Sequence, residues 1–468
     1  MKGSRRLHML LFAITLAALV SAPLALPERA LAQFQTQTNA GALVLRALQV
    51  LEETYVDPVE TVPLLNQALA AARHVNGAEV STDQVPDLPS GLAPSEARRQ
   101  FLERFGQIAA ANRSVPEIQL AHAAIRAITG TFKDSHTGFL SPEQYRERIR
   151  RQRGEPGFSG IGIVLMARDG AFYVREVVPN SPAEQAGLRA LDRIIRVDGK
   201  TTHGITADQI SGMIRGPSGT EVVVTVQRAG APEPLSFPIV RAPISIPSAR
   251  SQMLAPDIGY VRLYQFDMGT ANLVRSAVAS VLDAGAQMLI LDLRGNPGGF
   301  LHELNRVVEI FLPRGIPAYG LRQRGQGLVV MRTQGDPAVP PTMPLVVLVD
   351  ESSASAAELL ASAIQEQRRG AVIGMKTAGA VEASILVPLP DGSALSVTIA
   401  RMYSGRGARL EGVGVAPDQE VQISTVDLER GQDSQLAAAI RVVRDRSVRR
   451  VLPTGLVIGL RPAAVLVP

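Results

Sequence analysis

Two stretches of the sequence decide the fold: Leu291–Gly299 (LDLRGNPGG) and, about 50 residues further along, Val349–Glu358 (VDESSASAAE). Each one predicts a buried strand that runs into a turn of glycines or small residues and then into a helix. The first turn offers backbone N–H groups, and the second offers a serine at a helix start. A serine beside backbone anion donors is what acyl transfer to a hydroxyl requires.

The polar atoms for such chemistry can be named from residue type alone. Ser352, Ser353 and Ser355 are all candidate nucleophiles, and Gly298 and Gly299 are candidate oxyanion partners. Glycine suits that role because it lets a backbone approach a carbonyl closely and adopts positive φ without strain. The alternative is that the serines only cap the following helix and the glycines only form a turn.

The surrounding segment, about 247–417, alternates strands and helices. Ile258–Leu263 and Met288–Leu293 read as strands joined by a helix over 270–284, and 345–349 and 371–374 read as further buried strands. Such βαβ alternation predicts an α/β fold with a mostly parallel sheet and helices covering its faces.

Upstream of this segment the pattern changes twice. Residues 40–75 have apolar residues at helical spacing and predict helices, the Gly- and Pro-rich stretch 76–100 predicts a loop, and a helix resumes at Phe101. From about 158 to 239 the pattern is one of short strands and turns, beginning with the glycine turn at 160–162. The order of these elements resembles a circularly permuted PDZ domain of the kind inserted in bacterial proteases.

Together these motifs resemble the carboxyl-terminal processing proteases, a family of S41 serine peptidases, over roughly 40–436. The resemblance implies a crotonase-like α/β peptidase core with an inserted PDZ-like, β-rich domain and an N-terminal helical region. It divides the chain into a signal peptide (1–32), a helical region (33–150), a PDZ-like domain (151–242), a peptidase core (243–425) and a C-terminal helix with a basic tail (426–468).

The family's nucleophile motif, Ser-Ala-Ser-Ala-Ser-Glu, matches Ser353–Glu358 and implies that Ser355 is the nucleophile. Ser355 would then lie at the first turn of a helix over 356–365, where free N–H groups and the helix dipole favour developing negative charge. The Ala356 N–H, next to the nucleophile, would be the second oxyanion donor beside Gly298 or Gly299.

The base that the common members of this family use is missing. Their lysine lies 25 residues after the serine, and that position here is Ala380; their glutamine four residues later is Ser384. The usual Ser–Lys dyad therefore cannot form. Lys376 is nearby, and we interpret it as structural or solvated, because active members carry a lysine there as well as the catalytic one.

A second branch of the superfamily, which includes the tricorn core and a chlamydial secreted protease, uses serine, histidine and glutamate. The turn Asp134–Thr137 (DSHT) and the segment Glu411–Asp418 (EGVGVAPD) resemble that branch's histidine and glutamate segments. The resemblance implies that His136 is the general base, since histidine has an ordinary pKa of about 6.5, and that Glu411 orients it. Two alternatives remain: another base, for which His302 is a weak candidate, or a peptide-binding scaffold that has lost catalysis.

The PDZ-like domain implies a partner. PDZ domains capture a chain terminus by strand addition, with a glycine turn holding the carboxylate. Gly160, Ile161 and Gly162 would supply N–H groups, and Ile210 and Met213 would line an apolar groove. The expected ligands are proteins or peptides with apolar C-termini. The alternative is that this domain only packs on the core as a lid.

The N-terminus predicts export. A basic start, an apolar stretch over 7–20 and the small residues Ala30–Ala32 before Gln33 form a signal peptide pattern. We expect a periplasmic or extracellular protein; the alternative is an uncleaved membrane anchor. No later segment is long and apolar enough to span a membrane.

Composition limits the remaining classes. The 468 residues include no Cys, which excludes disulfides, thiolate catalysis and Cys-based metal sites. Most of the formal charge of +5 lies in the signal peptide, so there is no case for nucleic acid. The six His are scattered and no His-Glu-x-x-His pattern occurs, so we predict neither a metal nor a cofactor. The helical region before Val115 mediates dimerisation in some relatives, which leaves self-association open.

Overall fold

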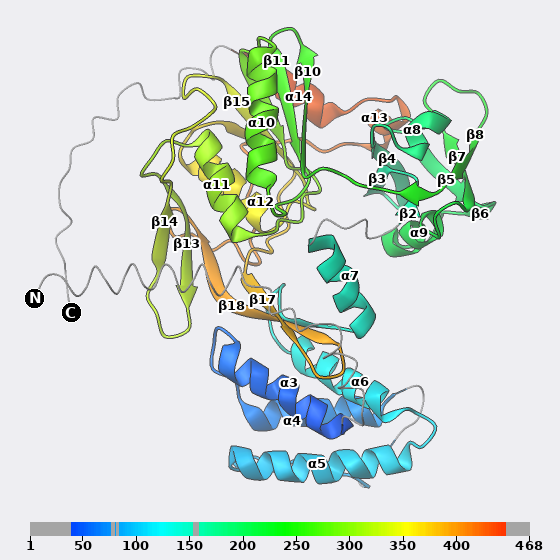
Figure 1. The fold of residues 1–468 in the computed structure, drawn as a ribbon, viewed down its shortest axis with the longest axis vertical. Helices are drawn as coiled ribbons and strands as arrows, with labels where there is room; N and C mark the ends of the chain where they lie inside the picture. Colours follow the sequence, from blue (N-terminus) through cyan, green and yellow to red (C-terminus); the bar gives the residue numbers. More distant parts are fainter. Residues whose placement is uncertain (1–38, 76–79, 81–83, 153–158, 446–468) are drawn as a thin grey trace, which may run out of the picture. The chain divides into compact units, whose positions relative to one another are not determined.

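The structure is a computed structural model that describes residues 39–75, 80, 84–152 and 159–445 (Figure 1). The predicted signal peptide and basic tail lie outside these residues. The chain divides into two compact units. The first comprises Met1–Ile149, Leu321–Val329 and Glu382–Met402, and the second comprises Arg150–Gly320, Val330–Val381 and Tyr403–Pro468.

The first unit is a layer of helices on a small antiparallel sheet. Its helices are α3 (Ala40–Thr54), α4 (Thr61–Arg73), α5 (Pro94–Ala111) and α6 (Glu117–Gly130), with α7 (Pro142–Gln152) beyond them. Strands β1 (Gly138–Leu140) and β17 (Ala383–Pro388) both pair with β18 (Ala394–Ser404). The core joins the two layers, because buried residues of the helices pack with Leu395 and Val397 of β18 and with Leu389 in the turn between β17 and β18.

The predicted loop over 76–100 is partly wrong, since α5 begins at Pro94 rather than at Phe101. Proline is favoured at the first helical position, where its missing N–H costs nothing. Ala97, Phe101, Phe105 and Ile108 then form one buried face at helical spacing. The composition of the stretch hid the helix, because its polar first turn reads as loop.

The PDZ-like part of the second unit is a small antiparallel barrel-like sheet with two short helices. Its main sheet has the order β3-β4-β5-β7-β8, with β6 paired to β5. The bounds are β2 (Ser159–Gly160), β3 (Ile163–Arg168), β4 (Ala171–Val177), α8 (Pro182–Ala186), β5 (Arg193–Val197), β6 (Lys200–Thr201), α9 (Ala207–Ile214), β7 (Glu221–Gln227), β8 (Leu235–Val240) and β9 (Ala242–Pro243). β7 alternates buried residues with residues that are partly or fully exposed, as a half-buried strand should.

The peptidase part contains a six-stranded sheet of order β10-β11-β12-β15-β16-β19, parallel throughout except for β10. The strands of this sheet are β10 (Ala249–Ala255), β11 (Ile258–Leu263), β12 (Met288–Asp292), β15 (Leu345–Val349), β16 (Ala371–Gly374) and β19 (Gln419–Glu420). The helices are α10 (Thr270–Asp283), α11 (Leu301–Phe311), α12 (Ala356–Glu366), α13 (Thr425–Glu429) and α14 (Ser434–Arg444). Strands β13 (Pro317–Gln323) and β14 (Val329–Arg332) pair with each other outside this sheet. The predicted parallel α/β sheet is confirmed.

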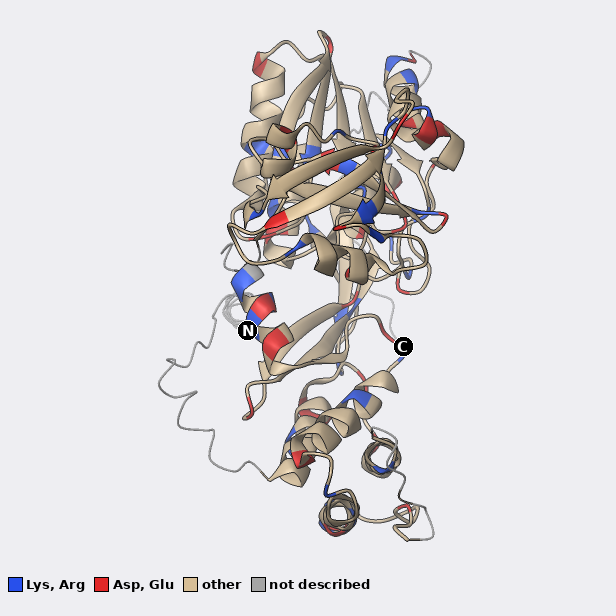
Figure 2. Cartoon of the chain, turned by 90° about the vertical axis from the view of Figure 1, so that its right-hand side faces the viewer, with Lys and Arg blue, Asp and Glu red and all other residues tan. Residues whose placement is uncertain are grey.

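Helices cover both faces of this sheet (Figure 1). Met288 and Ile290 point to one face, where they pack against Ala438 and Val443 of α14. Helices α10 and α12 contact the sheet through β10, β11 and β16, and α11 lies between these two helices. Because both faces are covered, β12 and β15 are buried along their whole length, which explains their continuous apolar sequences. Acidic and basic residues lie interspersed along the elements in view in Figure 2.

A buried ionic cluster fixes the carboxyl ends of β11 and β12. The carboxylate of Asp292 accepts hydrogen bonds from Arg262 at 2.6 Å, from Arg294 at 2.6 Å and from Tyr260 at 2.8 Å. Arg294 also contacts Asp433, the residue that caps α14, at 2.9 Å. Although burial favours the protonated acid, the charges of Arg262 and Arg294 outweigh it and hold the pKa of Asp292 well below its usual value.

Within the residues that the structure describes, no helix has the length and hydropathy to cross a membrane.

We expect Asp292→Asn to destabilise the fold by about 3–5 kcal/mol, because it leaves two guanidinium groups buried without their counter-charge. Since the folded-state pKa of Asp292 is depressed, its stabilising contribution exists above the unfolded-state pKa and is lost as the pH falls toward the folded-state value. Urea unfolding at several pH values measures both effects. The control is Asp336→Asn, because Asp336 is 81% exposed and contacts Arg314 only at 3.7 Å. Equal unfolding midpoints for the two variants would contradict the role of the cluster.

Candidate active site

Ser355 has a strained backbone on a tight turn between a buried strand and a helix. Strand β15 ends at Val349, and α12 begins at Ala356 with Ser355 as its first flanking residue. Ser355 has φ 55° and ψ −119°, a region that residues with a side chain rarely adopt. Strain of this kind, about 1–3 kcal/mol, persists only where neighbours enforce it, and it is typical of nucleophiles exposed on strand-to-helix turns.

Two contacts hold the Ser355 backbone in this conformation. Its N–H donates to the carbonyl oxygen of Ala380 at 2.7 Å and lies 3.0 Å from the Glu358 carboxylate. Position 380 is thus directly beside the candidate nucleophile, and what occupies it is a methyl group. Lys376 lies four residues earlier in the same loop, and its side chain is exposed.

Glu358 connects the nucleophile helix to that loop, and the sequence interpretation assigned it no role. The buried carboxylate also accepts the N–H groups of Gly379 at 2.7 Å and Ala380 at 2.9 Å and the Thr377 hydroxyl at 2.5 Å. Burial raises its pKa above the usual value, and the hydrogen bonds only partly offset this. The signal that could have identified it is the spacing Ser355-x-x-Glu358, which is that of a capping box.

The glycine turn lies against Ser355. A Cβ on Gly298 would come within 2.5 Å of the Ser355 Cβ, and Gly298 has φ +92°. The Gly298 N–H is already engaged, since it donates to Asn296 Oδ1 at 2.8 Å. Asn296 in turn accepts the Ala354 N–H through its carbonyl, which ties the two turns together.

Gly299 and Ala356 carry backbone N–H groups that are available to a ligand. Gly299 is exposed and extends the turn beside the strand-like residue Phe266. Ala356 is the first residue of α12, where the N–H groups have no partner within the helix. Among the hydrogen bonds of the described residues, neither N–H has an acceptor. Backbone N–H groups without an acceptor are the donors that an oxyanion needs.

Glu411 is buried close to the same loop. Its carboxylate accepts the Val381 N–H at 2.8 Å, one residue beyond Ala380. The turn that follows Glu411 pairs with the loop, because the Gly412 N–H donates to the Gly379 carbonyl at 2.8 Å. The structure therefore brings Ser355, Gly298, Ala356, Ala380 and the Glu411 segment together within the second unit.

His136 belongs to the first unit and lies in the turn between α6 and β1. Its ring is half-buried, and Nδ1 lies 2.7 Å from the Ser135 hydroxyl. The weaker candidate His302 lies on the first turn of α11, with its ring 5.3 Å from that of Phe300 and its side chain 42% exposed.

The predicted peptide-binding residues divide into two groups. Ile161 and Ile210 are buried in the core of the PDZ-like part, whereas Met213 is only partly buried on α9. Gly160 and Gly162 flank Ile161, and Gly162 has φ +85°. Its tight approach to Ser181 leaves no room for a side chain, so the glycine turn is sterically required.

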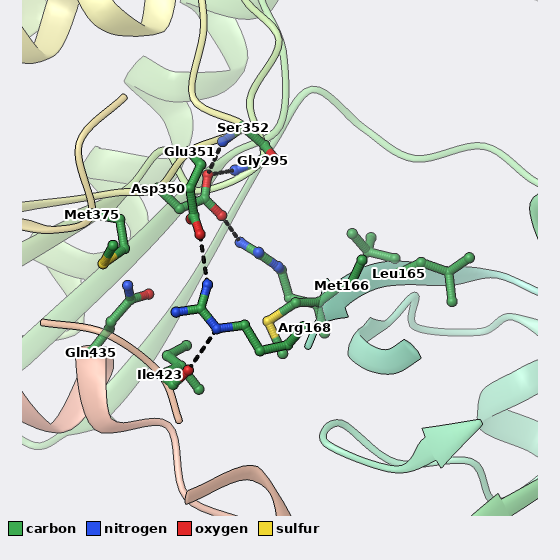
Figure 3. Close-up of a pocket in the computed structure, with 13 residues that line it drawn as sticks. Leu165, Met166, Arg168, Gly295, Asp350, Glu351, Ser352, Met375, Ile423 and Gln435 are labelled. Atoms are coloured by element: carbon green, nitrogen blue, oxygen red, sulfur yellow. Dashed lines mark hydrogen bonds and ion pairs between the residues drawn. The ribbon is translucent and has the colours of Figure 1, made fainter. Parts of the chain in front are cut away.

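A pocket of about 380 Å³ lies between β3 and the turn that precedes Ser355 (Figure 3). Arg168 reaches across it to Glu351 at 2.7 Å, and Arg175 forms an ion pair with Asp350 at 2.6 Å whose angle is poor for a hydrogen bond. Asp350 also accepts the Gly295 N–H at 2.7 Å. The two basic and the two acidic side chains that line the pocket balance each other in charge. Its walls come from the PDZ-like part and from the turn that precedes Ser355. The described residues contain no group of acidic or His side chains suited to a metal ion.

We expect Gly298→Ala to lower the stability of the peptidase part by about 3 kcal/mol or more, because it combines positive-φ strain with a clash against Ser355. Gly295→Ala is the matched control in the same turn: its φ is +69°, but a Cβ there would meet nothing closer than 3.8 Å. It should cost about 1–2 kcal/mol. Urea denaturation of both variants measures the difference, and equal losses would show that Gly298 and Ser355 are not in contact.

Comparison with known proteins agrees with this geometry. The profile of Peptidase family S41 matches residues 257–421, and that of the PDZ domain matches 173–228. The carboxyl-terminal-processing protease of Synechocystis sp. is 31% identical over 326 residues, which is 68% of this chain and 76% of the relative. The carboxy-terminal-processing protease of Bartonella bacilliformis is 31% identical over 349 residues, 72% of this chain and 78% of the relative.

A solved structure shows the same likeness over most of the chain. The photosystem II D1 C-terminal processing protease superposes with a TM-score of 0.53 at 25% identity, covering 89% of this chain and 100% of that one. The chain thus resembles these proteases in sequence and in fold. The chain belongs to the carboxyl-terminal processing proteases of peptidase family S41.

Proposed function

We propose that this chain is an active serine endopeptidase in which Ser355 is the nucleophile, His136 the general base and Glu411 its carboxylate partner. The observation that carries the proposal is the strained Ser355 backbone, held against a glycine turn beside the Gly299 and Ala356 N–H groups. A turn that served only to cap a helix would have no need of positive φ at a serine.

In the proposed reaction the Ser355 Oγ attacks the carbonyl carbon of a peptide bond and passes its proton to His136. In the tautomer whose Nδ1–H donates to the Ser135 hydroxyl, Nε2 is unprotonated and would accept this proton. The Glu411 carboxylate would then act on the ring through its charge rather than through a hydrogen bond to Nδ1. The oxyanion is held by the Gly299 and Ala356 N–H groups, and Gly298 shapes the turn rather than donating.

The rest of the cycle needs no further group. The C–N bond breaks as the imidazolium protonates the leaving amine, which gives an acyl-enzyme on Ser355. Water then attacks the ester carbonyl and passes a proton to His136. The bond between the acyl carbon and the Ser355 Oγ breaks as the imidazolium returns that proton to Oγ, which releases the acid product. The Glu411 carboxylate would stabilise the imidazolium that forms in each half of the cycle.

The substrates we propose are proteins with unstructured, apolar C-terminal tails. The PDZ domain supports this proposal. A peptide that adds as a strand at the free edge of β3 gains affinity from backbone hydrogen bonds, whatever its sequence. An apolar groove would then favour peptides with apolar side chains. The signal peptide pattern supports a periplasmic or extracellular location, where a retained signal would attach the protein to the membrane.

A second candidate function rests on Ala380. The methyl group lies where the common members of the family carry their base, directly beside Ser355. If no other group replaces that lysine, the fold is a peptide-binding pseudoprotease that retains the turn and the groove.

Hydrolysis of an unfolded protein with an apolar C-terminus separates the two functions. We expect Ser355→Ala and His136→Ala each to lower kcat/KM by about 10³-fold or more, and Glu411→Gln to lower it by a smaller factor. Lys376→Ala is the matched control and should stay within about twofold, because its side chain is exposed.

The outcomes of this experiment are distinct. Loss in the Ser355 and His136 variants with retention in the Lys376 variant supports the triad. Loss in the Lys376 variant instead would assign the base to lysine. Wild-type protein that binds the tail peptide but never cleaves it would establish the pseudoprotease.

A further inference from the structure

Asp134 lies two residues before His136 and is the most heavily hydrogen-bonded side chain of that turn. One oxygen accepts the backbone N–H groups of His136 at 3.0 Å and Thr137 at 2.7 Å and the Thr398 hydroxyl at 2.7 Å. The other oxygen accepts the Tyr55 hydroxyl at 2.8 Å and the Thr137 hydroxyl at 3.0 Å. The two backbone bonds are local, whereas Tyr55 and Thr398 come from distant parts of the sequence.

The charge state of this cluster is well defined at neutral pH. Burial opposes ionisation of Asp134, but the hydrogen bonds from Thr398, Thr137, Tyr55 and His136 outweigh it and lower the pKa of the carboxyl. Burial, followed by the hydrogen bond to Asp134, raises the pKa of Tyr55 to about 12. Tyr55 is therefore a neutral donor and Asp134 an anionic acceptor throughout the range in which histidine titrates.

A second layer holds the donors in place. Arg401 on β18 donates to the Tyr55 hydroxyl at 3.1 Å and to Glu382 at 3.2 Å, and it also pairs with Asp57. Glu382 accepts the Met402 N–H at 2.8 Å, which fixes the end of the same strand. All the residues of this hydrogen-bond network belong to the first unit.

The backbone beyond the turn is fixed as well. Strand β1 pairs with β18 from Gly138, only two residues after His136. On the other side, Asp134 binds the N–H groups of the turn itself. His136 is thus held between two restraints on its backbone, and Ser135 contacts its ring at Nδ1.

We infer that Asp134 is the positioning residue for the base His136: it fixes the turn that presents the imidazole and supplies a negative charge that favours the protonated ring. This inference rests on the proposed role of His136. A charge that favours imidazolium makes the base stronger, and a fixed turn removes the cost of orienting it during each cycle.

Three variants separate the effect of Asp134 on the position of the turn from the effect of its negative charge. Asp134→Ala removes both, so kcat should fall about 100-fold with KM within about twofold, which is the cost of misplacing a catalytic group by about 1 Å. Asp134→Asn keeps an acceptor for the two N–H groups but removes the charge, so activity should return to within about tenfold of wild type. Tyr55→Phe removes one hydrogen bond and should lower kcat about fivefold.

The pH profile identifies the electrostatic part, which a purely structural role would leave unchanged. With the negative charge gone, the imidazole loses its proton at lower pH, so the acid limb of kcat/KM should move to lower pH in Asp134→Asn. NMR titration of the His136 ring in a Ser355→Ala background reports the same shift without any turnover. The control is Asp87→Asn, which removes a carboxylate of the same unit from its ion pair with Arg73 and should leave kcat and both pH limbs unchanged.

Each outcome decides the inference. Wild-type kcat and an unshifted acid limb in both Asp134 variants, with His136→Ala inactive, would overturn the positioning role and leave the triad intact. Full activity in His136→Ala would overturn both, because there would be no base to position. If Asp134→Ala fails to fold, Asp134→Asn and Tyr55→Phe still carry the test, since both keep the shape of the turn. A lower titration midpoint of the His136 ring in Asp134→Asn, with no change in Asp87→Asn, would support the inference.

Discussion

The backbone of Ser355 is the constraint around which the peptidase part is organised. A residue with a side chain at φ 55° has to be held by its neighbours. The Ala380 carbonyl and the Glu358 carboxylate bind its N–H group, and Gly298 fills the space beside its Cβ. Each of these neighbours is fixed in turn, Gly298 through Asn296 and Ala380 through Glu358. The buried strands β12 and β15 deliver both turns to the same edge of the sheet.

The loop that contains Ala380 is held in place by hydrogen bonds of its backbone. Ala380 keeps its carbonyl on Ser355 and its N–H on Glu358, and the loop stays paired with the turn after Glu411. On the side of the loop these contacts all involve the backbone, so they do not depend on which side chain is present at position 380.

Much of the fold could be predicted from the sequence, because it follows from local patterns. Continuous apolar runs mark β12 and β15 as buried on both faces, and the glycine turn 160–162 marks the entry to the PDZ domain. The start of α5 could not be predicted, since a polar first turn resembles a loop. The motif placed Ser355 on its turn, but nothing in it shows that Glu358 holds the loop or that Asp350 meets Arg175. Those contacts join residues that are far apart in the sequence and depend on how buried charges are compensated.

The discontinuity of the first unit also sets the order in which the protein can be completed. Its helices are made early, yet their core includes Leu389, Leu395 and Val397, and the turn of His136 is tied to Thr398. During synthesis on the ribosome, more than half of the chain has to be made after these helices before the strands of their sheet are present. Contacts of such high sequence separation are formed late and slowly. The histidine turn is therefore completed only once β18 has emerged, so a nascent or truncated chain carries the nucleophile segment before it has the anchor that orders the base.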